Sequence, residues 1–485
     1  MLAPLDLLDQ LQARLDEGIA LVPTSRAGGF ASLVLELPEL PALPPDLDCP
    51  RFGCSHGQRG ELRAGYGIAA EWTAQGPERL QELRTQARRL TAHWQQIDPD
   101  ETGFQGFALL GFAASLDPAP LPSFRPEHRP DRPPRPSEGT DAAPGPGSGL
   151  PNALLWLPEL GLCTRRGQSA LVLTTSLPVP PRALRARWRG WLTRLLPALA
   201  GPLPEPLTPS RLTALGSRPG LDDWTVLVES ALAEIRRGAL DKVVLCRQVG
   251  LQGRRPFDQR RLLAALTYLF PSCQVISLQR GERRFVAATP ERLLRVQGRQ
   301  VEVDAIAGTA ARSASPVQDA ALTAALRSSD KNRREHALVV KAVQEVLHAC
   351  CDRVQFPPTP DVLQLHNAQH LWSRVTGHLR GDMDLFGLAE RLHPTPATNG
   401  EPSREARAWL SRAEPIARGW YTGAAGILEP DLSGELWVLL RCAEIQGESA
   451  WLYAGAGIVD GSDPLAEWRE TDHKLAAVAT ALQFS

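Results

Sequence analysis

A chain of 485 residues, with 43% apolar and 22% charged residues, has the composition of a globular protein and the length for one large core or several smaller ones. A formal net charge of −1 leaves no basic field of the kind that binds nucleic acid or an anionic membrane. No apolar run reaches the roughly 18 residues that span a bilayer, and the acidic, amphipathic N-terminus does not resemble a signal peptide. The eight scattered cysteines, none in a C-x-x-C pair, are therefore expected to be reduced thiols of a cytoplasmic protein.

The first half of the chain predicts a mixture of helices and strands. Helices are expected near 4–17, 77–96 and 181–199, strands near 31–37, 107–115, 152–160 and 169–174, and a further element at 63–72.

Two proline-rich stretches interrupt this pattern. The segment 116–152 is dense in Pro, Gly, Ser and charge and lacks an apolar period, so we expect a disordered or extended surface excursion. Strand-like sequences flank it on both sides, so it is expected to interrupt a sheet and not to separate two domains. The stretch 201–212 is the better candidate for a boundary.

From about residue 220 onward, helices and strands alternate. Helices are expected near 222–237, 257–269, 330–350, 384–392, 402–413 and 464–482, and strands near 241–248, 273–279, 284–288, 292–297, 299–304, 361–365, 371–379, 435–446 and 449–457. The pattern predicts an α/β chain with large sheets and helices packed on them.

Lysine is rare in this chain, which has four lysines among 53 basic residues. One of them, Lys242, stands at the head of the apolar run 241–248. Arginine keeps its proton in a protein whereas lysine can lose it, so a lysine retained here is a candidate general base. The alternative is chance survival in an arginine-rich chain.

The last helix carries a row of charged side chains. Glu467, Glu470 and Lys474 fall at i, i+3 and i+7 on one face. A solvated stripe with an ion pair would give the same pattern. The preceding strand, however, contains three glycines, and a glycine inside a strand often marks the close approach of a ligand.

A second helix supplies a further carboxylate, because Glu335 lies in the first turns of 330–350. Glu335 and Glu470, one from each helix, could together hold a hard cation. Mg²⁺ takes one or two protein carboxylates and completes its shell with water and substrate oxygens.

Other features are typical of a pocket. Glu291 follows a Thr-Pro turn, and Gly308 and Thr309 are expected in another turn. The segment 391–406 packs three prolines and a glycine between helices, a rigid loop that can shape a binding site. Arg441 stands in an otherwise apolar strand, where a buried guanidinium needs a partner such as a substrate carboxylate.

These segments, in this order, resemble the chorismate-utilising enzymes, a family that includes isochorismate, anthranilate, aminodeoxychorismate and salicylate synthases. The resemblance covers about residues 220–482 and rests on KVVLCR, ATPERL, AIAGTAAR, SDKNRREH, HLWSRVTGHL, LHPTPATNG, RGWYTGAAG, LLRCAEI and LYAGAGIVDGSDPLAEWRET. It implies a single large α/β (α+β) fold with two facing sheets and outer helices. Residues 1–215 would be its divergent N-terminal half and 220–482 its catalytic core.

Carried over position by position, the resemblance also implies roles for individual residues. Lys242 would be the general base that activates a water, and Glu291 the general acid. Glu335 and Glu470 would bind Mg²⁺, with Glu467 in the outer shell. The residues implied in substrate binding are Gly308, Thr309, His370, Ala397, Tyr421, Arg441, Gly455 and Lys474.

Within the family, the loop sequence LHPTPA is similar to that of isochorismate synthases. Salicylate synthases tend to have Thr where Ala397 stands. The ammonia-using members typically carry a PAGT-like loop and tend to lack a lysine at the position of Lys242. The chain departs from the family at Asn332, where an acidic residue often stands, and this weakens one possible outer-shell contact to the metal.

The resemblance therefore implies an Mg²⁺-dependent isomerase that converts chorismate to isochorismate, adding water and losing the 4-hydroxyl. We expect a monomer without an obligatory glutaminase subunit, serving menaquinone biosynthesis, with siderophore biosynthesis as the other branch. The alternatives are a salicylate synthase, an ammonia-using anthranilate or aminodeoxychorismate synthase component I, and a non-catalytic chorismate-binding relative.

Overall fold

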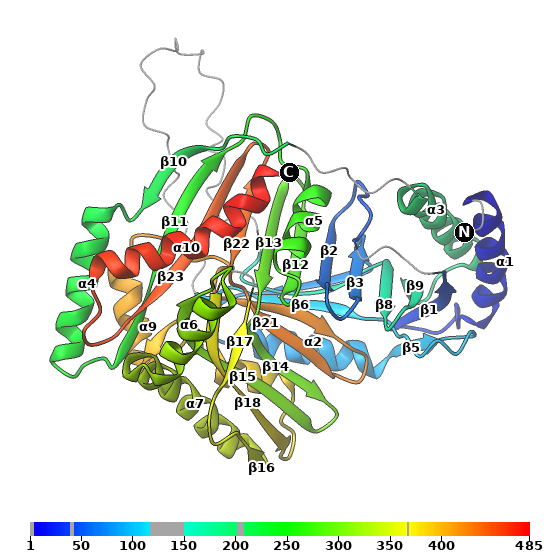
Figure 1. Ribbon diagram of the computed structural model, residues 1–485. Coiled ribbons are helices and arrows are strands. Elements are labelled where there is room, and N and C mark those ends of the chain that lie inside the picture. Colours follow the sequence, from blue (N-terminus) through cyan, green and yellow to red (C-terminus); the bar gives the residue numbers. More distant parts are fainter. Residues whose placement is uncertain (1–3, 39–42, 117–149, 201–207, 366–367) are drawn as a thin grey trace, which may run out of the picture.

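The computed structural model describes residues 4–38, 43–116, 150–200, 208–365 and 368–485. Within these ranges the chain forms two large β-sheets and ten helices (Figure 1). The helices are α1 (Pro4–Leu21), α2 (Arg79–Ala92), α3 (Pro181–Ala200), α4 (Leu221–Arg236), α5 (Gln259–Leu269), α6 (Pro316–Ser328), α7 (Asp330–Cys350), α8 (Leu385–Leu392), α9 (Ser403–Ala413) and α10 (Pro464–Gln483). None of them is both long and apolar enough to cross a membrane.

The larger sheet contains 13 strands in the described part of the chain. Twelve follow the order β10 (Thr213–Arg218), β11 (Lys242–Gln252), β23 (Ser449–Ile458), β22 (Cys442–Gln446), β13 (Arg283–Thr289), β12 (Gln274–Arg280), β2 (Arg51–His56), β3 (Glu61–Tyr66), β8 (Leu160–Arg165), β9 (Gln168–Ser176), β1 (Phe30–Leu37) and β5 (Trp94–Ile97), and β19 (Gly400–Glu401) pairs with β11. The pairing of β2 with β12 joins the first half of the chain to the second within this sheet.

The smaller sheet contains ten strands among the same described residues. Nine follow the order β16 (Cys351–Gln355), β18 (Ala368–Leu379), β15 (Gln300–Ala311), β14 (Arg292–Gln297), β21 (Gly434–Val438), β20 (Ala424–Leu428), β6 (Ala108–Phe112), β7 (Ala153–Leu157) and β4 (Ala70–Ala74), and β17 (Asp361–Gln364) pairs with β18. Here β6 and β20 join the two halves of the chain.

The two sheets pack face to face over one apolar core. Phe52 and Phe285 from the larger sheet lie in the same buried cluster as Leu109 and Trp437 from the smaller one. Successive side chains of a strand point to opposite faces, so Leu110, next to Leu109, packs instead with α2, α7 and α8. The helices α1, α3, α5 and α10 cover the outer face of the larger sheet. The predicted α/β fold with two facing sheets and outer helices is confirmed (Figure 1).

The proline-rich segment joins two adjacent strands. Residues 117–149 lie outside the described residues, but β6 and β7 on either side of them pair directly, with Leu109 opposite Trp156. The segment therefore interrupts a sheet, as the flanking sequences indicate.

Some predicted elements differ from the observed ones. The helix expected at 77–96 ends at Ala92, and 94–97 form β5, because this short segment pairs with β1. The strand expected at 435–446 is two strands in different sheets, β21 and β22. The elements that the sequence pattern does not predict are β2, β8, β10, β16, β19, β20 and α6. These six strands are too short to show a clear apolar alternation, so pairing with partner strands, and not local sequence, defines them.

Candidate active site

A cavity of about 120 Å³ lies between the two sheets and is lined by both of them and by α7 and α10. Eleven of the residues singled out in the sequence line it: Glu291, Gly308, Thr309, Glu335, His370, Ala397, Tyr421, Arg441, Gly455, Glu470 and Lys474. Two others, Lys242 and Glu467, do not line the cavity but bind side chains next to it. Elements far apart in the chain thus bring the predicted set together.

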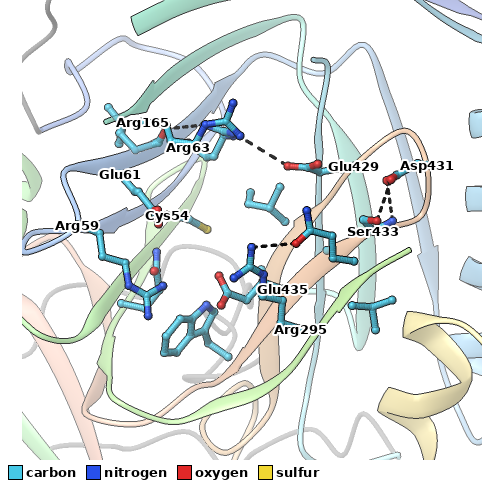
Figure 2. A pocket seen from close by; sticks show the side chains of 18 residues that line it. Cys54, Arg59, Glu61, Arg63, Arg165, Arg295, Glu429, Asp431, Ser433 and Glu435 are labelled. Carbon is cyan, nitrogen blue, oxygen red and sulfur yellow. Dashed lines mark hydrogen bonds and ion pairs between the residues drawn. The ribbon is translucent and has the colours of Figure 1, made fainter. Parts of the chain in front are cut away.

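A larger cavity of about 240 Å³ is a weaker candidate (Figure 2). Its wall is rich in charge of both signs, and these charges compensate one another. Arg63 lies 4.0 Å from Glu429, and Glu435 binds Arg292 at 3.1 Å. None of the residues predicted to take part in chemistry lines this cavity, so we assign the active site to the smaller one.

Lys242 and Glu335 form a buried ion pair beside the smaller cavity. Lys242 begins β11 and is only 1% exposed, and its Nζ donates a hydrogen bond of 2.8 Å to Oε1 of Glu335 on α7. Gly457 of β23 makes room for the pair. A Cβ at this position would stand 2.9 Å from Cε of Lys242 and 3.0 Å from Oε1 of Glu335. One of the three glycines noted in the sequence is therefore required by a close approach of side chains.

Three of the four lysines of the chain bind the three glutamates that the resemblance implies near Mg²⁺. The pairs are Lys242–Glu335 at 2.8 Å, Lys331–Glu467 at 3.0 Å and Lys474–Glu470 at 2.7 Å. Burial alone would raise the pKa of Glu470, but the charges of Lys474 and Lys331 lower it. Each of the three carboxylates thus lies beside a lysine ammonium group.

Glu335 and Glu470 fit a magnesium site by the chemistry of their donors. Both carboxylates line the same cavity, and Gly457 leaves space beside Glu335. In the described ranges, no three His, Cys, Asp or Glu side chains are grouped closely enough to hold an ion by themselves. Mg²⁺ needs only one or two protein carboxylates. Glu467, which is 2% exposed and outside the cavity wall, is not placed for direct coordination.

Glu291 is a buried acid in the wall of the same cavity. It lies between β13 and β14 and is 5% exposed. Burial raises its pKa to about 8, against the lowering effect of the positive charge on Lys242. Thr395 donates a hydrogen bond of 3.5 Å to its Oε1. The carboxyl group therefore carries its proton at neutral pH and can act as an acid.

Arg441 faces the cavity without a carboxylate partner in the described part of the chain. It lies between β21 and β22, where the chain crosses from one sheet to the other, and its φ of 48° is in the left-handed region. Its guanidinium contacts Nε2 of His370 at 3.4 Å and Sγ of Cys273 at 3.7 Å. A cation held this way is suited to bind an anionic ligand.

His370 is neutral and links Arg441 to Thr309. Burial, followed by the charge of Arg441, lowers the pKa of His370 to about 3. Its Nε2 can then accept from Arg441, while Nδ1 donates to Oγ1 of Thr309 at 3.1 Å. The turn expected at Gly308 and Thr309 is instead a β-bulge inside β15, with Gly308 at φ 75°. Asn332 supports this bulge, because its Oδ1 accepts from the backbone N of Thr309 at 3.3 Å.

The loop that carries Ala397 is fixed to β11 by a buried arginine. Arg418 donates hydrogen bonds of 2.6 Å to the carbonyl oxygens of Thr398 and Val244, and Glu414 neutralises its charge. This holds the small side chain of Ala397 at the cavity wall.

Some residues at the site are not predicted from the sequence. Tyr453 lines the cavity and stacks on Tyr421 with ring centroids 5.5 Å apart, and Thr395 donates a hydrogen bond to Glu291 as described above. Both stand within motifs noted in the sequence, LYAGAGIVDG and LHPTPATNG. Their place in a motif was the signal that could have identified them.

Comparison with known proteins agrees with this arrangement. The profile of a family described as chorismate binding enzyme matches residues 141–483. Isochorismate synthase MenF of Escherichia coli (strain K12) is 40% identical over 266 residues, which are 55% of this chain and 61% of that protein. Isochorismate synthase MenF of Bacillus subtilis (strain 168) is 34% identical over 261 residues, 54% of this chain and 55% of that protein. The chain thus matches somewhat more than half of the length of these curated relatives.

The structural similarity extends further than the sequence match. The solved structure of MenF, the menaquinone-specific isochorismate synthase from Escherichia coli, aligns with a TM-score of 0.75 and 27% identity. The alignment covers 99% of this chain and 100% of that chain. The divergent first half therefore shares the fold of that protein.

Proposed function

The chain belongs to the family of chorismate binding enzymes, and we propose that it is an Mg²⁺-dependent isochorismate synthase, an isomerase that converts chorismate to isochorismate. The observation that carries the proposal is the position of Glu291. A buried acid that is protonated at neutral pH lines the same cavity as Arg441, a cation with no carboxylate partner among the described residues. Isochorismate synthases at 34% and 40% identity support the choice within the family.

The cavity suits a dicarboxylate such as chorismate. Arg441 and Lys474 line it and carry positive charge toward the substrate carboxylates. Lys474 is held in position by Glu470 and by the carbonyl oxygen of Gly455, each at hydrogen-bond distance. The neutral His370 lies between Arg441 and the bulge of β15, where it can contact the substrate ring without adding charge.

Two side chains move the protons of the reaction. Lys242, once released from Glu335 and neutral, takes a proton from the water that attacks the ring carbon next to the carboxylate-bearing one. Glu291 gives its proton to the hydroxyl that leaves from the far end of the conjugated system. The net reaction moves a hydroxyl, and the two residues exchange their protonation states. Arginine at position 242 could not take the proton.

Glu335 and Glu470 are the side chains that would hold Mg²⁺. When bound, the ion supplies positive charge that draws electron density toward the ring carboxylate. Because Glu335 also accepts from Lys242, an ion held there would compete for this carboxylate, and a Lys242 released from it could act on the water.

We further propose that the enzyme serves menaquinone biosynthesis and works as a monomer in the cytoplasm. The structural match over 99% of this chain to MenF, a menaquinone-specific isochorismate synthase, supports the first point. The eight cysteines, all of them free thiols, support a reducing compartment. Rescue of a strain that lacks only its menaquinone-branch isochorismate synthase tests the pathway, with rescue of a siderophore-branch mutant alone as the contrary result.

The activity itself is tested with purified protein, chorismate and Mg²⁺ in water enriched in ¹⁸O. The expected product is isochorismate that carries ¹⁸O in its new hydroxyl, and excess chelator should abolish its formation. Anthranilate formed with ammonia, salicylate and pyruvate as dominant products, or no turnover would each support one of the alternatives. Turnover that persists in chelator would remove the metal from the proposal.

A further inference from the structure

The two helices that carry the proposed metal ligands pack on different sheets. The helix α7, with Glu335, lies against β15 and β18 of the smaller sheet, whereas α10, with Glu470, lies against β23 of the larger sheet (Figure 1). The distance between the two carboxylates therefore depends on how the two layers are held relative to each other. An ion that both carboxylates bind requires this distance to be right within a few tenths of an ångström.

Lys331 and Glu467 connect these two helices directly. Lys331 lies in the first turn of α7, one turn before Glu335, and Glu467 lies in the first turn of α10, one turn before Glu470. Their ion pair has an Nζ to Oε1 distance of 3.0 Å. The Glu467 side chain is 3% exposed, whereas that of Lys331 is 43% exposed. The pair therefore joins a buried carboxylate to a partly exposed lysine, and it is more shielded from solvent than a pair in which both side chains are exposed.

A second ion pair also links α7 to the larger sheet, but it cannot persist in the working enzyme. This is the contact of Glu335 with Lys242 on β11. Lys242 must be neutral to act as a base, and its ionic attraction to Glu335 would then be lost. The contact between Lys331 and Glu467 involves neither Lys242 nor Glu335, so it can remain during the reaction.

We propose that the ion pair of Lys331 and Glu467 is a strut that sets the spacing of Glu335 and Glu470 and thereby the affinity for Mg²⁺. Lys331 is then a positioning residue, and Glu467 acts by anchoring Lys331 and not by contacting the ion. The inference rests on the proposed function, because it assumes that Glu335 and Glu470 hold Mg²⁺.

The direction of the change in Mg²⁺ affinity when Lys331 is replaced distinguishes a positioning role from a purely electrostatic one. A positive charge next to a cation site weakens cation binding, so Lys331→Met should tighten Mg²⁺ binding if charge alone matters. A strut predicts the opposite result, because its removal lets the two ligand helices separate. Glu467 variants are less informative, because loss of the strut and loss of a nearby negative charge would both weaken Mg²⁺ binding.

The experiment measures Mg²⁺ binding to the substrate-free, full-length protein by calorimetry, with the Mg²⁺-dependent rise in Tm as a second readout. Lys331→Met should raise the Kd for Mg²⁺ by about tenfold or more, the usual effect of losing a residue that orients a metal ligand. Lys331→Arg should restore most of the affinity, because a guanidinium can also bridge to Glu467. The matched control is Lys341→Met, a lysine on the same helix whose exposed pair with Glu345 spans 3.9 Å.

Each outcome either supports or overturns the proposed strut. A Kd for Lys331→Met that is unchanged or lower, in protein shown to be folded by circular dichroism, overturns the strut. If the methionine variant does not fold, a Kd for Lys331→Arg far above that of the wild type overturns it as well. Glu335→Gln and Glu470→Gln test the underlying assumption separately. If these two variants bind Mg²⁺ as tightly as the wild type, the metal site itself is wrong, whatever Lys331 does.

Discussion

Replacing Glu291 with glutamine should change both the rate and the pH dependence of stability. Glutamine keeps the shape of the side chain but has no proton to give to the leaving hydroxyl. General acid catalysis typically contributes about 10²–10⁴ in rate, so kcat for Glu291→Gln should fall by at least the lower figure. The wild-type rate should itself decline as pH rises through about 8, because Glu291 then loses the proton that it must donate.

The stability effect follows from the same pKa. A pKa raised from 4.5 to about 8 in the folded protein corresponds to at most about 5 kcal/mol. Between these two values the folded state holds a proton that the unfolded state releases. The contribution is therefore fully present below pH 4.5 and is lost as pH rises through about 8. The glutamine variant has no such dependence, so it should gain stability relative to the wild type as pH rises.

Urea unfolding of both proteins, without substrate, at about pH 5, 7 and 9 measures this difference. The control is Glu345→Gln, which removes an exposed carboxylate from α7. A difference in unfolding free energy between Glu291→Gln and the wild type that does not change with pH would show that Glu291 is ionised like a surface carboxylate. An unchanged kcat in the glutamine variant would remove Glu291 from the acid role.

The remaining predictions concern the base, the space beside it, the substrate cation and the product. Lys242→Arg should be about as inactive as Lys242→Ala, a loss of at least about 10² in kcat, and a rate within tenfold of wild type would exclude Lys242 as the base. Gly457→Ala should lower kcat at least tenfold, because its Cβ would displace Lys242 and Glu335. The same variant should change the unfolding free energy by less than about 1 kcal/mol, since only flexible side-chain ends must move. Arg441→Lys loses the planar fork and should raise KM about 10- to 100-fold, and an unchanged KM would mean that no carboxylate binds there. Ala397→Thr should increase the share of salicylate in long incubations analysed by chromatography, whereas the wild type should form mainly isochorismate.

Two residues of the site lie in a different local structure from the one expected, because tertiary structure and not local sequence determines it. Arg441 is expected within one strand, but the chain there leaves the smaller sheet at Val438 and enters the larger sheet at Cys442. Gly308 is expected in a turn and lies in a bulge, because β15 continues past it and pairs with β18. Both differences arise from strand pairing between segments far apart in the chain, and a periodicity of apolar residues carries no information about which partner a strand will find.

What the sequence determined by itself is the set of chemical groups and their local order. Helical spacing alone puts Glu467, Glu470 and Lys474 on one face of α10, and the ordered motifs identify the candidate acid, base and metal ligands. The pairing of the charges and the raised pKa of Glu291 depend on how the two sheets pack around the cavity. Lys242 shows the difference most clearly. Its rarity marks it as a candidate base, but only the fold shows that it is buried, outside the cavity wall and bound to Glu335. Such contacts depend on distances between residues that lie 93 positions apart in the chain, and these distances are set by the packing of whole layers.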